Sequence, residues 1–151
     1  MKKLILTFLL FLSMISTSTA PPSNMLIVPE ITFKVPRIVY YDAGFYEDLI
    51  NALYKYEAKC NPFAYNPVEE ATGGLQIRPI RLAHYNELTN SNYTIEDCYN
   101  FEISKKIFLY FCNHDGSGKL IPWKTWEQAA KDWNGSGPMT ITYWENVKQL
   151  I

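Results

Sequence analysis

The sequence predicts one mainly α-helical domain with a short extended element near residues 73–78. Apolar side chains recur in several segments at the spacing of one helix face. Alternation of apolar and polar residues, which is typical of strands, is scarce. Asparagine, glycine and proline separate the helical segments, as expected at turns.

The first predicted helix has a regular apolar stripe, formed by Phe45, Leu49, Ala52, Leu53 and Tyr56. Asp42 is the expected N-cap. Pro62 is expected to end the helix, because proline lacks a backbone N–H group and clashes with the preceding turn. Glu57 follows directly after the stripe, so we expect it in the last turn.

The elements after this helix are predicted in the same way. Residues 73–79 form a turn followed by a short extended piece, and helices follow over residues 79–88, 101–112, 123–133 and 140–150. Asn100 is the expected N-cap of the helix over 101–112. Residues 113–120 imitate the start of a calcium loop, but Lys124 stands where that loop requires glutamate. We therefore interpret them as a polar turn.

The N-terminal segment has the features of a secretory signal peptide. Lys2 and Lys3 precede an apolar run, and small polar residues follow up to Ala20. The apolar run has about 12 residues, whereas a spanning helix needs roughly 20, so no stable membrane anchor is expected. We predict a signal peptide over residues 1–20, an extended proline-containing lead-in over 21–43, and export to the periplasm or the cell exterior.

Charge and cysteine content restrict the partners and cofactors. The formal net charge is −1, and removing the two lysines of the signal peptide leaves −3. There is no basic run that could follow phosphates, so nucleic acid is not an expected partner. His84 and His114 lack zinc-ligand spacing with any cysteine pair, so neither a metal nor a cofactor is expected. Three cysteines leave at least one unpaired thiol, and pairing of Cys60 with Cys98 or Cys112 stays open.

Glu57 is a candidate general acid. It shares a helix face with Ile50, Leu53 and Tyr54. Partial burial and the negative end of a helix dipole both favour the protonated carboxyl, which a general acid requires near neutral pH. Taken alone, this position is more typical of a solvated glutamate at a helix end.

The residues that follow Glu57 form a spaced pattern. It resembles that of the goose-type lysozyme and soluble lytic transglycosylase domain, Glu-Ser-x-x-Asn-Pro-x-Ala-x-Ser followed by Gly-Ala-x-Gly-Leu-Met-Gln-Ile-x-Pro. The matching residues are Glu57, Asn61, Pro62, Ala64, Asn66 (in the place of serine), Ala71, Gly73, Gln76, Ile77 and Pro79. Residues 129–135 resemble a later segment of the same family. The domain that resembles this family spans residues 44–151.

The resemblance implies a lysozyme-like fold and an enzyme that acts on the glycan strands of peptidoglycan. It implies Glu57 as the catalytic acid and Asn66, Gln76 and Asn134 as substrate-binding residues. It also implies a lytic transglycosylase route with a single glutamate. In that route the muramic acid 6-hydroxyl attacks its own anomeric carbon and leaves a 1,6-anhydro end.

Two alternatives stay open at the level of sequence. A hydrolase needs a second carboxylate, which Glu69 or Glu70 would supply across the groove. A non-catalytic glycan-binding module on the same fold is favoured by Ala58, which stands where the family has serine. The intact Glu57 argues against that module.

Overall fold

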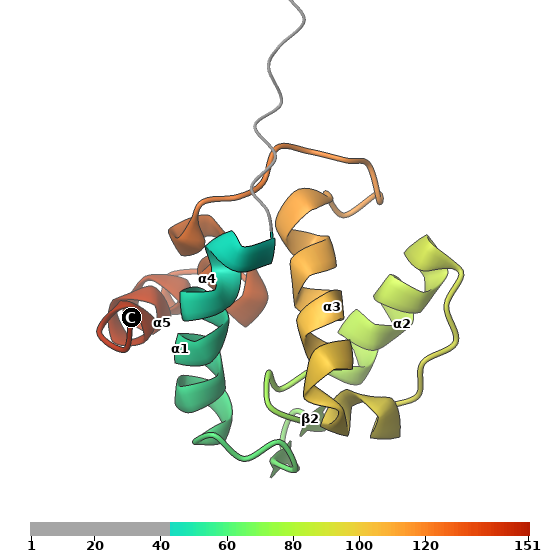
Figure 1. The fold of residues 1–151 in the computed structure, drawn as a ribbon, viewed down its shortest axis with the longest axis horizontal. Coiled ribbons are helices and arrows are strands. Elements are labelled where there is room, and N and C mark those ends of the chain that lie inside the picture. The colour runs from blue at the N-terminus through green and yellow to red at the C-terminus, as the bar shows by residue number, and fades with distance from the viewer. Residues whose placement is uncertain (1–42) are drawn as a thin grey trace, which may run out of the picture. The chain divides into compact units, whose positions relative to one another are not determined.

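The computed structural model describes residues 43–151, so the predicted signal peptide, the lead-in up to residue 42 and the predicted cap Asp42 lie outside the described residues. The described part is mainly helical, as predicted. Its elements are the 3-10 helix η1 (Ala43–Tyr46), α1 (Glu47–Ala58), β1 (Tyr65–Asn66), β2 (Ala71–Thr72), α2 (Pro79–Thr89), the 3-10 helix η2 (Glu96–Tyr99), α3 (Phe101–Asn113), α4 (Trp126–Asn134) and α5 (Met139–Lys148). Figure 1 shows α4 and α5 on one side of α1, and α2 beyond α3.

Helix α1 ends at Ala58, four positions before Pro62. The prediction that Pro62 ends the helix is therefore wrong, because the helix stops before it reaches the proline. Lys59 and Cys60 both adopt left-handed backbone angles, with φ of 50° and 60°, and this conformation cannot continue a right-handed helix. The Tyr54 hydroxyl donates to the Cys60 carbonyl at 2.7 Å and closes the turn.

The extended element lies mostly before the predicted span. Strands β1 and β2 pair antiparallel, with Tyr65 opposite Thr72, and a further bridge joins Thr72 to Ile77. Within residues 73–78, a turn occupies the positions up to Gln76, whose φ is 51°. The prediction located the turn correctly but missed the hairpin, because two-residue strands are too short to show a period of two.

Gly73 is needed at this turn. Its φ is +80°, and a Cβ atom there would lie 2.0 Å from the carbonyl oxygen of Cys98. Any side chain would clash with the backbone of η2, so only glycine allows the hairpin to lie this close.

The later helices confirm the predicted pattern with shifted ends. The Asn100 side chain accepts from the backbone N–H of Glu102 and caps α3, as predicted. Helix α4 begins at Trp126 rather than at residue 123, because Thr125 and Gln128 form a capping box that starts the helix there. Helix α5 begins one residue before the predicted start and ends two residues before the predicted end.

The core is built around the rings of α3 and its neighbours. The ring centre of Phe108 lies 5.1 Å from that of Trp133 and 6.1 Å from that of Tyr46, and both contacts are edge-on. Trp133 is only 6% exposed and belongs to this core. Helix α5 packs on α1 and α4, so residues of α5 reach the end of α1.

Two other predictions concern the loop after α3 and the membrane. Asp115 Oδ1 accepts hydrogen bonds from Ser117 and Lys119, which makes this segment a polar turn, as predicted. In residues 43–151 there is no helix long and apolar enough to span a membrane.

All three cysteines are free thiols in the structure.

Candidate active site

Glu57 lies in the last turn of α1 and lines a small cavity of about 110 Å³, which we call the acid cavity. The lining residues come from α1, the hairpin region, α2 and the end of α4. They are Glu57, Glu69, Gln76, Arg78, Arg81, Trp133 and Asn134. The fold thus brings three of the four predicted site residues to one cavity.

The Glu57 carboxyl is largely withdrawn from solvent. Burial raises the pKa of Glu57, and the nearby charge of Glu69 raises it further. A hydrogen bond from Tyr143 and the positive charge of Arg78 lower the pKa of Glu57, but they do not offset the burial. The net effect extends the pH range in which the carboxyl keeps its proton.

Tyr143 on α5 is the direct partner of Glu57. Its hydroxyl donates to Glu57 Oε1 at 2.5 Å, and burial raises the pKa of Tyr143, so this hydroxyl stays a donor. The Tyr143 ring lies edge-on to Tyr56 at 5.2 Å, and the Tyr56 hydroxyl accepts from Asn146 at 3.2 Å. These contacts fix the phenol, and through it one oxygen of the acid.

Sequence reasoning did not identify Tyr143 as a site residue. The available signal was its place on the buried face of α5, where Thr140, Tyr143 and Val147 recur at helical spacing. A tyrosine on such a face indicates a need for a buried hydrogen-bond partner, but it does not say which one.

Gln76 lines the acid cavity, and the nitrogen of its side-chain amide is already hydrogen-bonded within the protein. Its Nε2 group donates to the carbonyls of Gly73 at 2.9 Å and Ala64 at 3.3 Å. These two bonds occupy both amide protons. The side-chain oxygen is therefore the group that Gln76 offers to a ligand, as an acceptor for a hydroxyl.

The two predicted asparagines have different surroundings. Asn134 is the last residue of α4 and lines the acid cavity. Asn66 is not among the lining residues, and its Oδ1 accepts from the backbone N–H of Val68 at 3.0 Å within the hairpin. Its contact with substrate stays a prediction.

A second carboxylate, that of Glu69, lines the same cavity. Arg78 Nη2 pairs with Glu69 Oε1 at 2.8 Å. Glu70, the other carboxylate considered from the sequence, is not among the lining residues. The pair of Arg78 and Glu69 places opposite charges beside the acid.

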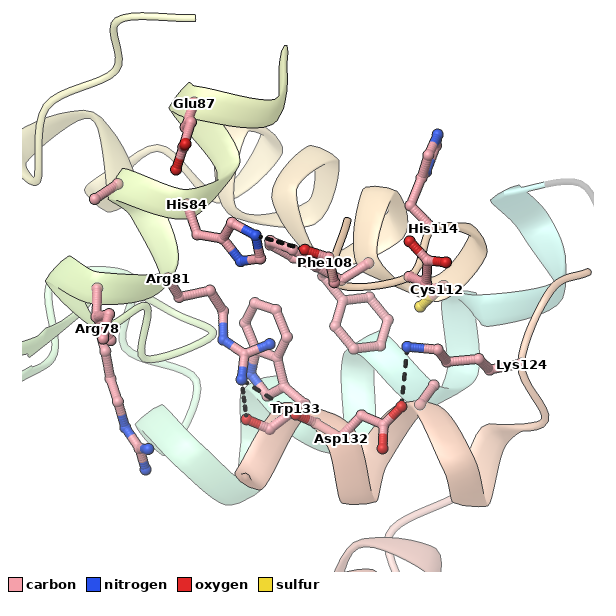
Figure 2. A pocket seen from close by; sticks show the side chains of 16 residues that line it. Arg78, Arg81, His84, Glu87, Phe108, Cys112, His114, Lys124, Asp132 and Trp133 are labelled. Atoms are coloured by element: carbon pink, nitrogen blue, oxygen red, sulfur yellow. Dashed lines mark hydrogen bonds and ion pairs between the residues drawn. The ribbon is translucent and has the colours of Figure 1, made fainter. Parts of the chain in front are cut away.

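A larger cavity of about 650 Å³ adjoins the acid cavity, and we call it the large cavity. The two share Arg78, Arg81 and Trp133 as lining residues. Figure 2 shows Arg81 reaching from α2 toward Trp133, with Lys124 and Asp132 on the other wall. Glu57 lies outside this lining.

Among residues 43–151, no group of three or more histidine, cysteine or acidic side chains is placed to hold a metal ion. No family model, curated protein or solved structure matches the chain.

Proposed function

We propose that this protein cleaves the β-1,4 bond between N-acetylmuramic acid and N-acetylglucosamine in peptidoglycan, with Glu57 as general acid. The observation that carries the proposal is the raised pKa of the Glu57 carboxyl in the acid cavity, beside Gln76 and Asn134. A general acid must hold a proton near neutral pH and meet the leaving oxygen in a cleft. The substrate class follows from the resemblance around Glu57.

The hydrogen bond from Tyr143 assigns roles to the two carboxyl oxygens. Because Oε1 accepts from Tyr143, the transferable proton is on Oε2. Glu57 then protonates the glycosidic oxygen through Oε2 and becomes a carboxylate. Tyr143 stabilises this carboxylate because a hydrogen bond to the charged form favours it.

Two further groups of the cavity suit the substrate. The amide oxygen of Gln76 accepts from a sugar hydroxyl, since its two protons are held by Gly73 and Ala64. The side chain of Asn134 provides an amide for the acetamido group of an adjacent sugar. Both positions hold the ring while the bond to its neighbour breaks.

The preferred product is a 1,6-anhydro-muramic acid end. After the first step, the Glu57 carboxylate takes the proton of the 6-hydroxyl, whose oxygen attacks the anomeric carbon of the same sugar. One glycosidic C–O bond breaks, one intramolecular C–O bond forms, and no water is consumed. An intramolecular nucleophile held in place has a large advantage over free water.

A muramidase is the second candidate, and Glu69 favours it. A hydrolase uses a carboxylate across the cleft to activate water, and Glu69 lines the acid cavity together with Glu57. The ion pair with Arg78 engages only Oε1 of Glu69, so Oε2 could accept a proton from water.

Mass spectrometry of digested peptidoglycan distinguishes the two candidates. For the transglycosylase we expect anhydro-muropeptides, lighter by one water than hydrolysis products, from the wild type and from Glu69→Gln. Glu70→Gln is the matched control, because Glu70 is the neighbouring carboxylate outside the cavity lining. Reducing-end products that disappear only in Glu69→Gln would establish the muramidase, and absence of cleavage by the wild type would overturn both candidates.

A further inference from the structure

The large cavity has no part in the chemistry proposed above. Its volume of about 650 Å³ falls in the range of small-molecule binding sites. Its walls combine the rings of Phe108, Phe111 and Trp133 with charged groups from α2 and α4. It shares three lining residues with the acid cavity, so the two cavities lie next to each other.

Arg81 lies at the junction of the two cavities. Its Nη2 group donates to the backbone carbonyls of Trp133 at 3.0 Å and Asp132 at 3.1 Å. The guanidinium carbon lies 4.4 Å from the centre of the Trp133 ring and 5.5 Å from that of Phe111. The guanidinium is therefore held in one orientation (Figure 2).

Within the described residues, no carboxylate forms an ion pair with Arg81. Glu69 pairs with Arg78, and Asp132 pairs with Lys124 at 2.9 Å. The two carbonyl contacts engage one nitrogen of a group that has five N–H donors. A planar carboxylate fits such donors in a forked arrangement.

The surroundings of Arg81 disfavour an uncompensated positive charge. Burial and the neighbouring Arg78 lower the pKa of Arg81, whereas the charge of Asp132 opposes this shift. A partly buried charge that is only partly compensated is unfavourable, so an anionic ligand would stabilise the Arg81 guanidinium. A neutral sugar ring would not.

We propose that the large cavity binds the peptide stem that peptidoglycan carries on its muramic acid, with a stem carboxylate on Arg81. This inference rests on the proposed function, because the sugar that bears the stem must lie in the acid cavity. The aromatic wall suits the methyl groups of the stem's alanines. Glu87 and Asp115, which also line the cavity, suit the amino group of a diamino acid in the stem.

The test measures binding of a free stem peptide, separately from cleavage. The probe is the synthetic tetrapeptide L-Ala-D-isoglutamine-L-Lys-D-Ala, in which the side-chain carboxyl of the second residue is bonded to lysine and the C-terminal carboxylate is free. It is titrated calorimetrically into the wild type and into Glu57→Gln. We expect equal affinities, and about tenfold weaker binding when the C-terminus is an amide, because the charge-assisted bond is lost.

Two variants locate the peptide. Arg81→Lys keeps the charge but loses the fork, and Ala83→Trp fills the large cavity from an exposed position on α2. We expect each to weaken binding at least about tenfold. Asn51→Trp, at an exposed position on α1 that lines neither cavity, is the control and should bind like the wild type. Circular dichroism confirms that each variant is folded.

The outcomes separate this inference from the proposed function. Absence of peptide binding, or binding that Ala83→Trp does not change, overturns the stem site. Binding of stemless glycan chains to the wild type that is lost in Ala83→Trp, without binding of the peptide, would assign the cavity to sugars and also overturn the stem site. Cleavage of stemless glycans by the wild type tests the proposed function independently, because that substrate has no stem.

Discussion

The hydroxyl of Tyr143 donates a 2.5 Å hydrogen bond to Oε1 of Glu57, which lies 86 positions earlier in the chain. This contact joins α5 to the end of α1. It lowers the pKa of Glu57, in opposition to the larger effect of burial. The Tyr143 hydroxyl can be removed by substitution while the burial of Glu57 is kept, so its effect on the pKa of Glu57 can be measured separately.

Tyr143→Phe should raise the pKa of Glu57 further, because it removes a bond that stabilises the carboxylate. We expect the alkaline limb of the pH profile of kcat/KM to move to higher pH. We also expect kcat to fall by about ten- to a hundredfold, since the carboxyl is no longer held in place. Initial rates on cell-wall suspensions at several pH values measure both effects.

Tyr56→Phe is the matched control for this variant. It keeps the ring beside Tyr143 and loses only the bond from Asn146. Its pH profile should match that of the wild type. An alkaline limb in Tyr143→Phe that does not move relative to this control would contradict the role of the Tyr143 hydroxyl.

Glu57→Gln should reduce the clearing of cell-wall suspensions by about 10²–10⁴-fold, the usual contribution of general acid–base catalysis. Glutamine keeps the shape and still accepts from Tyr143, but it has no proton to transfer. Near-normal clearing by a folded Glu57→Gln protein would exclude Glu57 as the acid.

The same variant should change the pH dependence of stability. Because the pKa of Glu57 is raised on folding, the folded state binds its proton more tightly than the unfolded chain does. The wild type therefore loses stability as pH rises from the unfolded value of about 4.3 through the folded pKa. Glu57→Gln should lack this loss, so the Tm of the variant should rise relative to that of the wild type as pH increases over that range. A Tm difference independent of pH would argue against a raised pKa.

Gly73→Ala should destabilise the turn that carries Gln76. The left-handed φ of +80° alone costs a non-glycine residue about 1–3 kcal/mol, and the approach of 2.0 Å to the Cys98 carbonyl adds to this. Gly116→Ala, where an added Cβ meets nothing within 4 Å, serves as the control. Urea unfolding of both variants measures the difference, and equal midpoints would contradict the described turn.

The three free thiols should differ in reactivity. Cys60 is exposed, whereas Cys98 and Cys112 are buried, and burial raises the pKa of Cys98 to about 12. A chromogenic thiol reagent should titrate one thiol in the native protein and three after unfolding. Cys60→Ser should leave none that reacts in the native state. A single thiol after unfolding of the wild type would reveal a disulfide instead.

The sequence by itself determined the helical character of the described domain and several of its local features. The apolar stripe of residues 45–56 predicts α1 and places Glu57 in its last turn, and Asn100 predicts the start of α3. These features depend on neighbours within a few positions, where helix periodicity and capping act. Local chemistry also locates the turn at Gly73, although not the two short strands that precede it.

Only the tertiary structure decided what surrounds the acid. Packing of α5 on α1 brings Tyr143 to Glu57, and the hairpin brings Glu69 to the cavity while Asn66 bonds within its own turn. Arg81 acquires its position from carbonyls at the end of α4. Hydrogen bonds, burial and charge pairing between distant segments depend on how helices pack, and a local pattern holds no information about the atoms it will meet across a cavity.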